Sequence, residues 1–136
     1  MRFDTKIAIV LREDLPVWQR LNMTAFLASA VAGGRDEVMG LPYQDGSGNG
    51  YLPMFRQPVL VFAGGAADLR AVWERARQRG LGLAVFTQEL FATGNDDDNR
   101  AAVRAVSAEK LDLAGLALHG RRADVDKAVK GLALHP

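Results

Sequence analysis

The sequence contains no cysteine and only two histidines, His119 and His135. Without cysteine there is no disulfide bond, no thiolate nucleophile and no cysteine-ligated zinc or iron–sulfur centre. Two histidines are too few for a histidine-rich metal site. The chemistry left to this chain is therefore that of carboxylates, amides, hydroxyls and basic side chains.

Neither sign of charge is in excess, because 17 Lys and Arg residues stand against 16 Asp and Glu residues, giving a net charge of +1. Such a balance creates no overall field toward nucleic acid or an anionic membrane. The apolar stretch near the N-terminus is interrupted by Asp4, Lys6 and Arg12, which argues against a signal peptide or a membrane span. We therefore expect a soluble, cytoplasmic protein without a nucleic-acid or membrane partner.

The chain does contain an alternation of strand and helix patterns. Apolar runs rich in β-branched residues predict strands at 6–12, 58–64, 82–87 and 112–120, and the closing segment is predicted as a short strand or tail. Apolar residues at helical spacing predict helices at 21–32, 69–79, 97–106 and 125–132, and a short helical turn is expected at 88–92. This order predicts one α/β domain over residues 1–136, a three-layer α/β/α sandwich around a small, mostly parallel sheet.

Two segments of this pattern stand out. Residues 21–32 are apolar on nearly every side, so this helix is predicted to be largely buried. Residues 40–58 are dense in glycine and proline, which predicts a long loop with room for a small hairpin. The loop is not a dinucleotide-binding loop, because Tyr51 stands where the third glycine would be and no strand leads directly into a helix there.

The acidic run at 95–98 has two readings, a metal site or a helix start. A calcium loop needs a glycine at its sixth position and a glutamate at its twelfth, but counting from Asp96 gives Ala101 and Ser107. The pattern favours a cap by Asn95 or Asp96, with further aspartates on the positive end of the helix dipole. We therefore predict a cap, with no metal and no cofactor.

Asn22 and Ser29 form an unusual polar pair in the apolar first helix. They are seven residues apart and so share one helix face, with Phe26 between them. A bond from each to a neighbouring backbone group would be a purely structural explanation, and it is the favoured one. No histidine is near in sequence to activate Ser29.

The order of the segments, from "KIAIVLREDL" to "LAGLALHGRRADVDKAVKGLAL", resembles the fold of the type 2 peptidyl-tRNA hydrolases. The runs "YLPMFRQPVLVFAG" and "TQELFATGNDDDNRAAV" resemble more closely a bacterial family related to that fold, the domain-of-unknown-function two-thousand family. The resemblance covers most of the chain except the glycine-rich loop. It implies a four-stranded mixed sheet between helical layers.

The catalytic motifs of those hydrolases are where this sequence departs from them. The enzymes carry a lysine at the start of the first helix and a histidine one to two turns later, and the matching positions here are Asn22 and Ser29. The aspartate of the enzymes falls near Gln88 or Glu89, and Thr93 matches their threonine. Since the lysine and the histidine are missing, peptidyl-tRNA hydrolysis is not carried over by the resemblance.

Two functions remain open for the face formed by Asn22, Ser29, Glu89, Thr93 and Asn95, of which all but Asn95 are predicted to meet in one pocket. The favoured one is a non-catalytic module that binds a small molecule or a partner chain, as a homo-oligomer such as a homodimer. The alternative is a hydrolase of a small ester or amide. Glu89 would then be the general base, Ser29 or Thr93 would lie near the scissile group, and Asn22 or Asn95 would donate a hydrogen bond.

Overall fold

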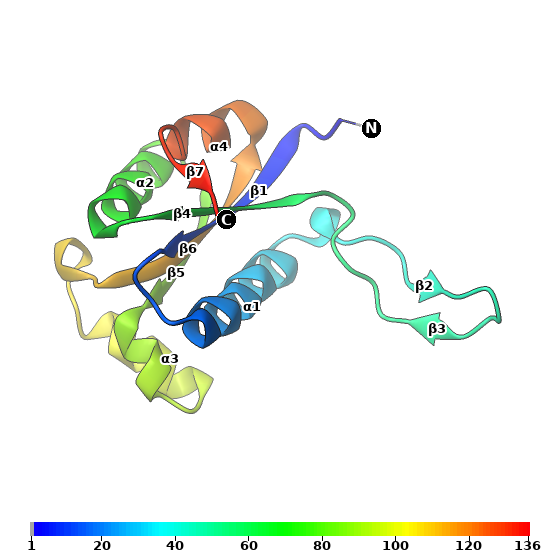
Figure 1. Ribbon diagram of the computed structural model, residues 1–136, viewed down its shortest axis with the longest axis horizontal. Coiled ribbons are helices and arrows are strands. Elements are labelled where there is room, and N and C mark those ends of the chain that lie inside the picture. The colour runs from blue at the N-terminus through cyan, green and yellow to red at the C-terminus, as the bar shows by residue number, and fades with distance from the viewer. Residues whose placement is uncertain (1) are drawn as a thin grey trace.

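A computed structural model describes residues 2–136 and has a five-stranded sheet at its centre, in the order β5-β6-β1-β4-β7 (Figure 1). Its strands are β1 Thr5–Arg12, β4 Val59–Gly64, β5 Gly82–Thr87, β6 Leu113–Arg121 and β7 Ala133–Leu134. A separate hairpin consists of β2 Tyr43–Gln44 and β3 Gly50–Tyr51. The helices are α1 Val17–Gly34, α2 Ala66–Gln78, α3 Asp96–Arg104 and α4 Arg122–Ala128. Short 3-10 helices are η1 Asp36–Val38, η2 Gln88–Ala92 and η3 Ala108–Lys110.

The α/β class and the mixed sheet are confirmed, but the prediction of four strands is wrong by one. The closing segment forms the fifth strand, because Ala133 and Leu134 pair with Ala63 and Phe62 of β4. The backbone of His135 then donates to the carbonyl of Val61 at 2.8 Å. The tail therefore covers part of an edge that β4 would otherwise expose.

The prediction of a mostly parallel sheet is also wrong. Within residues 2–136, β1 and β4 form the parallel pair, while β6 runs antiparallel to both β1 and β5. Strands β1, β4 and β5 do share one direction, as strand–helix–strand units require, but β6 inserts between β1 and β5. Every residue from Leu113 to His119 is buried, which is the pattern of a central strand with both faces covered.

The two faces of the sheet carry two core clusters because side chains alternate along each strand. In β1, Ile7 and Ile9 face the cluster that includes the buried residues of α1. Ala8 and Val10 face the other cluster, which includes residues of α2 and α4. Figure 1 shows α1 on one side of the sheet and α2 with α4 on the other.

The prediction that the first helix is largely buried is wrong. Only the stripe of Met23, Leu27 and Val31 is buried, and these residues lie four apart on one helix face. The helix comes close to β6 at Gly115, where a Cβ atom would lie 2.5 Å from the sulfur of Met23. Several apolar residues outside this stripe are exposed, namely Val17, Trp18, Leu21 and Phe26.

The predicted loop contains the hairpin of β2 and β3, which extends away from the body of the molecule (Figure 1). We call residues 41–54 the arm. Met39 and Phe55 bridge its base, and the backbone of Gly40 donates to the carbonyl of Met54 at 2.8 Å.

No helix of residues 2–136 is both long enough and apolar enough to cross a membrane.

Candidate functional site

A cavity of about 460 Å³ lies where the first turns of α1 meet η2 and the start of α3. We call it the aromatic pocket. It is lined by Trp18, Asn22, Phe26, Phe86, Leu90, Phe91, Thr93, Gly94, Asn95, Asp96 and Asn99. Its size and its mixture of apolar walls with a few polar groups are typical of small-molecule sites.

Four aromatic rings form a continuous wall of this pocket. Trp18 of α1 meets Phe91 of η2 edge to face, with centroids 5.9 Å apart. Phe91 lies 4.8 Å from Phe86 at the end of β5, and Phe86 lies 5.9 Å from Phe26 of α1. Because Trp18, Asn22 and Phe26 are four residues apart, one face of α1 presents them together.

The amide of Asn22 is free to meet a ligand in this pocket. Thr24 and Ser29, also on α1, donate to carbonyl groups of their own helix, at 2.6 Å to Arg20 and 2.6 Å to Phe26. The Asn22 side chain is exposed and has no hydrogen-bond partner among residues 2–136. An amide offers two donors and an acceptor, so Asn22 can bond a polar ligand edge of either kind.

Asn95 caps α3, as predicted. Its side-chain oxygen accepts from the backbone of Asp98 at 2.9 Å, and its amide donates to the Asp98 carboxylate at 2.9 Å. Asp96 and Asp97 both pair with Arg100 one turn later. Among residues 2–136 no three His, Asp or Glu side chains are grouped to hold a metal ion.

The hydroxyl of Thr93 is partly engaged. It donates to the carbonyl of Leu90 at 3.0 Å and contacts the side-chain oxygen of Asn99. These contacts fix the turn between η2 and α3, and they hold Asn99 beside the pocket. Thr93 therefore helps to order the polar part of the pocket lining.

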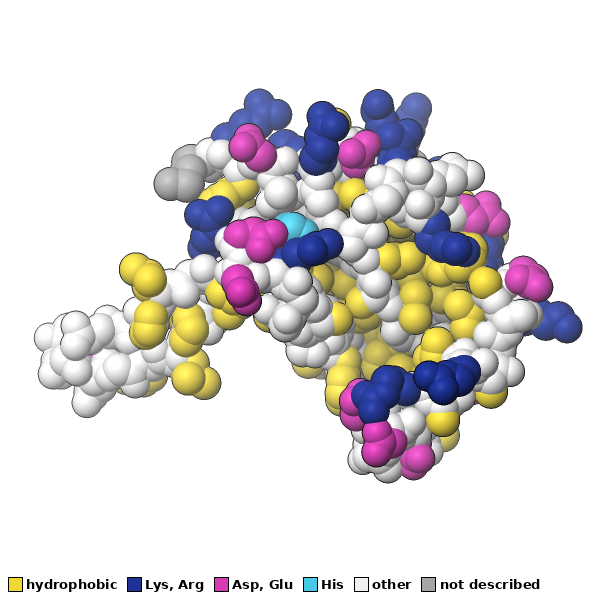
Figure 2. Space-filling view, turned by 180° about the vertical axis from the view of Figure 1, so that it is seen from behind, with side chains coloured by type: hydrophobic (Ala, Val, Ile, Leu, Met, Phe, Trp, Pro, Cys, Tyr) yellow, Lys and Arg dark blue, Asp and Glu magenta, His cyan; other side chains and the backbone are white. Residues whose placement is uncertain are grey.

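A second cavity, of about 660 Å³, adjoins the aromatic pocket and runs along the edge of β5. We call it the edge groove. Ser29, Ala84, Val85, Arg100 and Arg104 line it, and both cavities share Phe26, Phe86, Leu90, Asp96 and Asn99. Figure 2 shows apolar side chains gathered in a hollow of this face, with charged side chains on the lobe beside it.

The predicted site residues are thus partly brought together. Asn22, Thr93 and Asn95 line the aromatic pocket, and Ser29 lines the adjoining edge groove. Glu89 is exposed on η2 and lines neither cavity. The sequence analysis did not predict Trp18, Phe86, Phe91 and Asn99 as site residues. Trp18 stands four residues before Asn22, so helical spacing could have placed it on the same face.

His119 lies away from the aromatic pocket, in a smaller cavity of about 290 Å³ at the other end of α1. The residue is only 5% exposed, and its Nε2 atom is buried without a partner in the described chain. Burial lowers the pKa of His119; nearby Glu37 opposes this change and Arg35 adds to it. Its imidazole is therefore held in the neutral form at pH 7.

A family model described as "Protein of unknown function (DUF2000)" matches residues 5–136. The solved structure of a protein of unknown function, Atu0240 from Agrobacterium tumefaciens strain C58, matches with 43% identity and a TM-score of 0.95. That match covers 99% of this chain and 100% of the other, so it includes the arm. No curated protein matches the sequence.

Proposed function

The chain belongs to the DUF2000 family, and on that premise we propose that it is a non-catalytic module that binds a small planar ligand in the aromatic pocket. The observation that carries this proposal is the wall of four aromatic rings in the same pocket as the free amide of Asn22. Aromatic walls take a flat ring by stacking or edge contact. The amide selects ligands whose edge can donate or accept hydrogen bonds.

The groups around the pocket support binding rather than hydrolysis. The Ser29 hydroxyl donates to its own helix, and Glu89 lies outside both cavities. Neither His119 nor His135 lines the aromatic pocket or the edge groove. A nucleophile needs a base within hydrogen-bonding reach, and no such pair is found along these cavities in residues 2–136.

We propose that the chain shares with type 2 peptidyl-tRNA hydrolases a fold with helical layers on both faces of the sheet, and we take the resemblance no further than the fold. Fold alone does not carry a function from one protein to another. With Asn22 and Ser29 at the positions of the lysine and the histidine, we propose that the fold is retained without the peptidyl-tRNA hydrolase activity.

The test uses Trp18 as its reporter. The chain has two tryptophans, and Trp73 is stacked between Arg70 and Arg77 on α2, so Trp73→Phe leaves Trp18 as the only indole emitter. Adenine, uracil and nicotinamide serve as planar probes with polar edges, and toluene serves as a flat probe without one. We expect at least one polar probe to quench or shift the Trp18 emission, and toluene to bind more weakly.

Two variants separate binding from hydrolysis. Asn22→Ala should weaken binding of the polar probe about tenfold, because one hydrogen bond to the probe is lost. Ser29→Ala is the matched control and should bind as the parent does, since its hydroxyl is already used by the helix. The proposal fails if no polar probe binds, or if the parent hydrolyses p-nitrophenyl acetate or diacetyl-lysyl-tRNA with a rate that Glu89→Gln or Asn22→Ala abolishes.

A further inference from the structure

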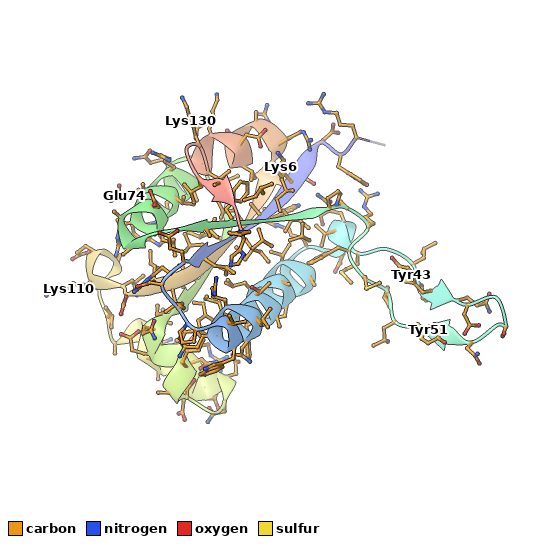
Figure 3. The ribbon with its side chains drawn as sticks, in the orientation of Figure 1. Lys6, Tyr43, Tyr51, Glu74, Lys110 and Lys130 are labelled. Carbon is orange, nitrogen blue, oxygen red and sulfur yellow. The ribbon has the colours of Figure 1, made fainter. Side chains whose placement is uncertain are left out.

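The arm has no support of its own. Strands β2 and β3 have two residues each and pair only with each other among residues 2–136. An isolated two-stranded hairpin is marginally stable in water. Figure 3 shows Tyr43 and Tyr51 on this hairpin, well clear of the helices and the main sheet. A hairpin of this kind is stabilised when it packs against another surface.

Five large apolar side chains of the arm are exposed. Leu41 is 84% exposed and Leu52 is 85% exposed, and Tyr43, Tyr51 and Met54 are also exposed. Figure 2 shows apolar side chains gathered along the part of the arm next to the body. Exposed apolar patches of this extent mark interaction sites.

The tip of the arm is ordered from within. Asp45 is the only charged residue of 41–54, and its carboxylate accepts from the backbone of Ser47 at 2.9 Å and of Asn49 at 3.0 Å. The Asn49 amide and the Tyr51 hydroxyl also donate to it, at 3.0 and 2.7 Å. The charge is therefore satisfied inside the tip, and the sides of the arm present an uncharged surface.

A matching surface lies on the body. A cavity of about 360 Å³ between α1 and the β4–β7 edge, which we call the α1–β4 cleft, is lined by Leu11, Val17, Arg20, Leu21, Thr24, Val61 and His135. Its rim carries Val17 and Leu21, which are 62% and 68% exposed. Arg20 is the basic side chain of this lining, and its guanidinium lies 2.9 Å from the His135 ring. Depletion of charge is the mark of an interface core.

The area of these surfaces suits a stable dimer. A fully exposed large apolar side chain offers roughly 150–200 Å². The exposed fractions of the five arm residues with those of Val17 and Leu21 then amount to about 700–900 Å² per chain. A standard interface buries about 800 Å² per partner. The arm extends away from α1 and from the β4–β7 edge of its own chain (Figure 1), so it does not cover its own α1–β4 cleft.

We propose that the partner is a second copy of this chain, in a twofold dimer in which each arm lies over the α1–β4 cleft of the other copy. Both halves of the contact are present in one chain, and both are largely apolar. Reciprocal exchange buries both arms and both clefts and closes the assembly at two copies. The proposal does not depend on what the aromatic pocket binds.

The first experiment measures mass in solution by light scattering after gel filtration. The parent should be a dimer, and Leu52→Asp on the arm and Leu21→Lys on the cleft should each raise the dimer dissociation constant at least about 100-fold, because each places a charged group in a largely apolar contact. Both side chains are exposed, so the monomer should keep its far-ultraviolet circular dichroism. Ala67→Asp, an exposed position on α2 across the sheet, is the charge-matched control and should remain dimeric.

The second experiment asks whether the arm and the cleft touch each other. A mixture of Leu52→Asp copies with Leu21→Lys copies can form a dimer with one Asp–Lys contact and one unaltered contact. The mixture should therefore dimerise although each variant alone does not. A monomeric parent would overturn the proposal, as would a dimer that survives Leu52→Asp. Failure of the mixture to dimerise would show that arm and cleft are not partners.

Discussion

The rings of Trp18 and Phe91 meet edge to face, with centroids 5.9 Å apart and planes at 73°. This contact joins the start of α1 to η2 and closes one side of the aromatic pocket. Phe91 is half-buried and also touches Phe86, whereas Trp18 is largely exposed. The two residues should therefore divide their roles, with Phe91 supporting the fold and Trp18 serving the pocket.

We predict that Phe91→Ala lowers the free energy of unfolding by about 2 kcal/mol, because a partly buried ring and its contacts are lost. Trp18→Ala should cost less than about 1 kcal/mol. Urea denaturation followed by circular dichroism measures both values. Equal costs for the two variants would contradict the division of roles.

Replacing the cap residue should loosen α3. Asn95→Ala should cost about 1 kcal/mol of stability, because the backbone N–H of Asp98 loses its acceptor. Asn95→Ser keeps a capping oxygen and is the control. Since we predict a cap and not a metal site, calcium or magnesium should leave the thermal midpoint of the parent unchanged. A midpoint that rises with either ion, and no longer does so after Asp96→Asn with Asp97→Asn, would contradict this prediction.

The hydrogen bonds at the tip of the arm predict how the carboxylate of Asp45 binds a proton. Hydrogen bonds from Tyr51 and Asn49 lower the pKa of Asp45 from 3.8 to about 2, with Tyr51 the largest cause. Tyr51→Phe should therefore raise the pKa of Asp45 toward 3.8. Tyr43→Phe, at the cross-strand partner of Tyr51, is the matched control and should leave it unchanged. A carbon-detected NMR titration of the Asp45 carboxyl measures the shift.

The sign of the pH effect at Asp45 follows from the lowered pKa. The unfolded chain binds the proton more readily than the folded tip does, so the stabilising contribution is present above about pH 3.8. It should be lost as the pH falls toward about 2. The protection factor of the Asn49 amide, which corrects hydrogen exchange for its intrinsic pH dependence, should fall over the same range, and a constant protection factor would refute the role of the carboxylate.

His119 should make the protein less stable in mild acid. Burial lowers its pKa below the ordinary value of 6.5, so the unfolded state takes up a proton that the folded state resists. Stability should therefore fall as the pH drops below about 6.5. His119→Gln cannot take up that proton and should show a smaller fall between pH 7 and pH 5. Denaturation curves of both proteins across this range test the prediction, which a parallel fall in the two would exclude.

The sequence by itself determined the local structure. Gly82–Thr87 is a strand and Gln88–Ala92 a helical turn within the predicted bounds, and Asn95 caps α3. The order of strands and helices could likewise be predicted from the sequence, as could the hairpin in the glycine-rich loop. Each of these depends on the chemistry of neighbours within a few residues, which the sequence states directly.

The tertiary structure alone decided the pairing of the sheet, the exposure of α1 and the makeup of the pocket. Strand β6 lies between β1 and β5 because its continuous apolar run can be buried on both faces, and no local signal gives the direction of its neighbours. The burial of α1 depends on how many elements pack around it, and here only the stripe through Leu27 is covered. Trp18 and Phe91 line the same pocket, whereas Glu89, two residues from Phe91, does not. Contacts between distant segments of this kind depend on how the helices pack on the sheet.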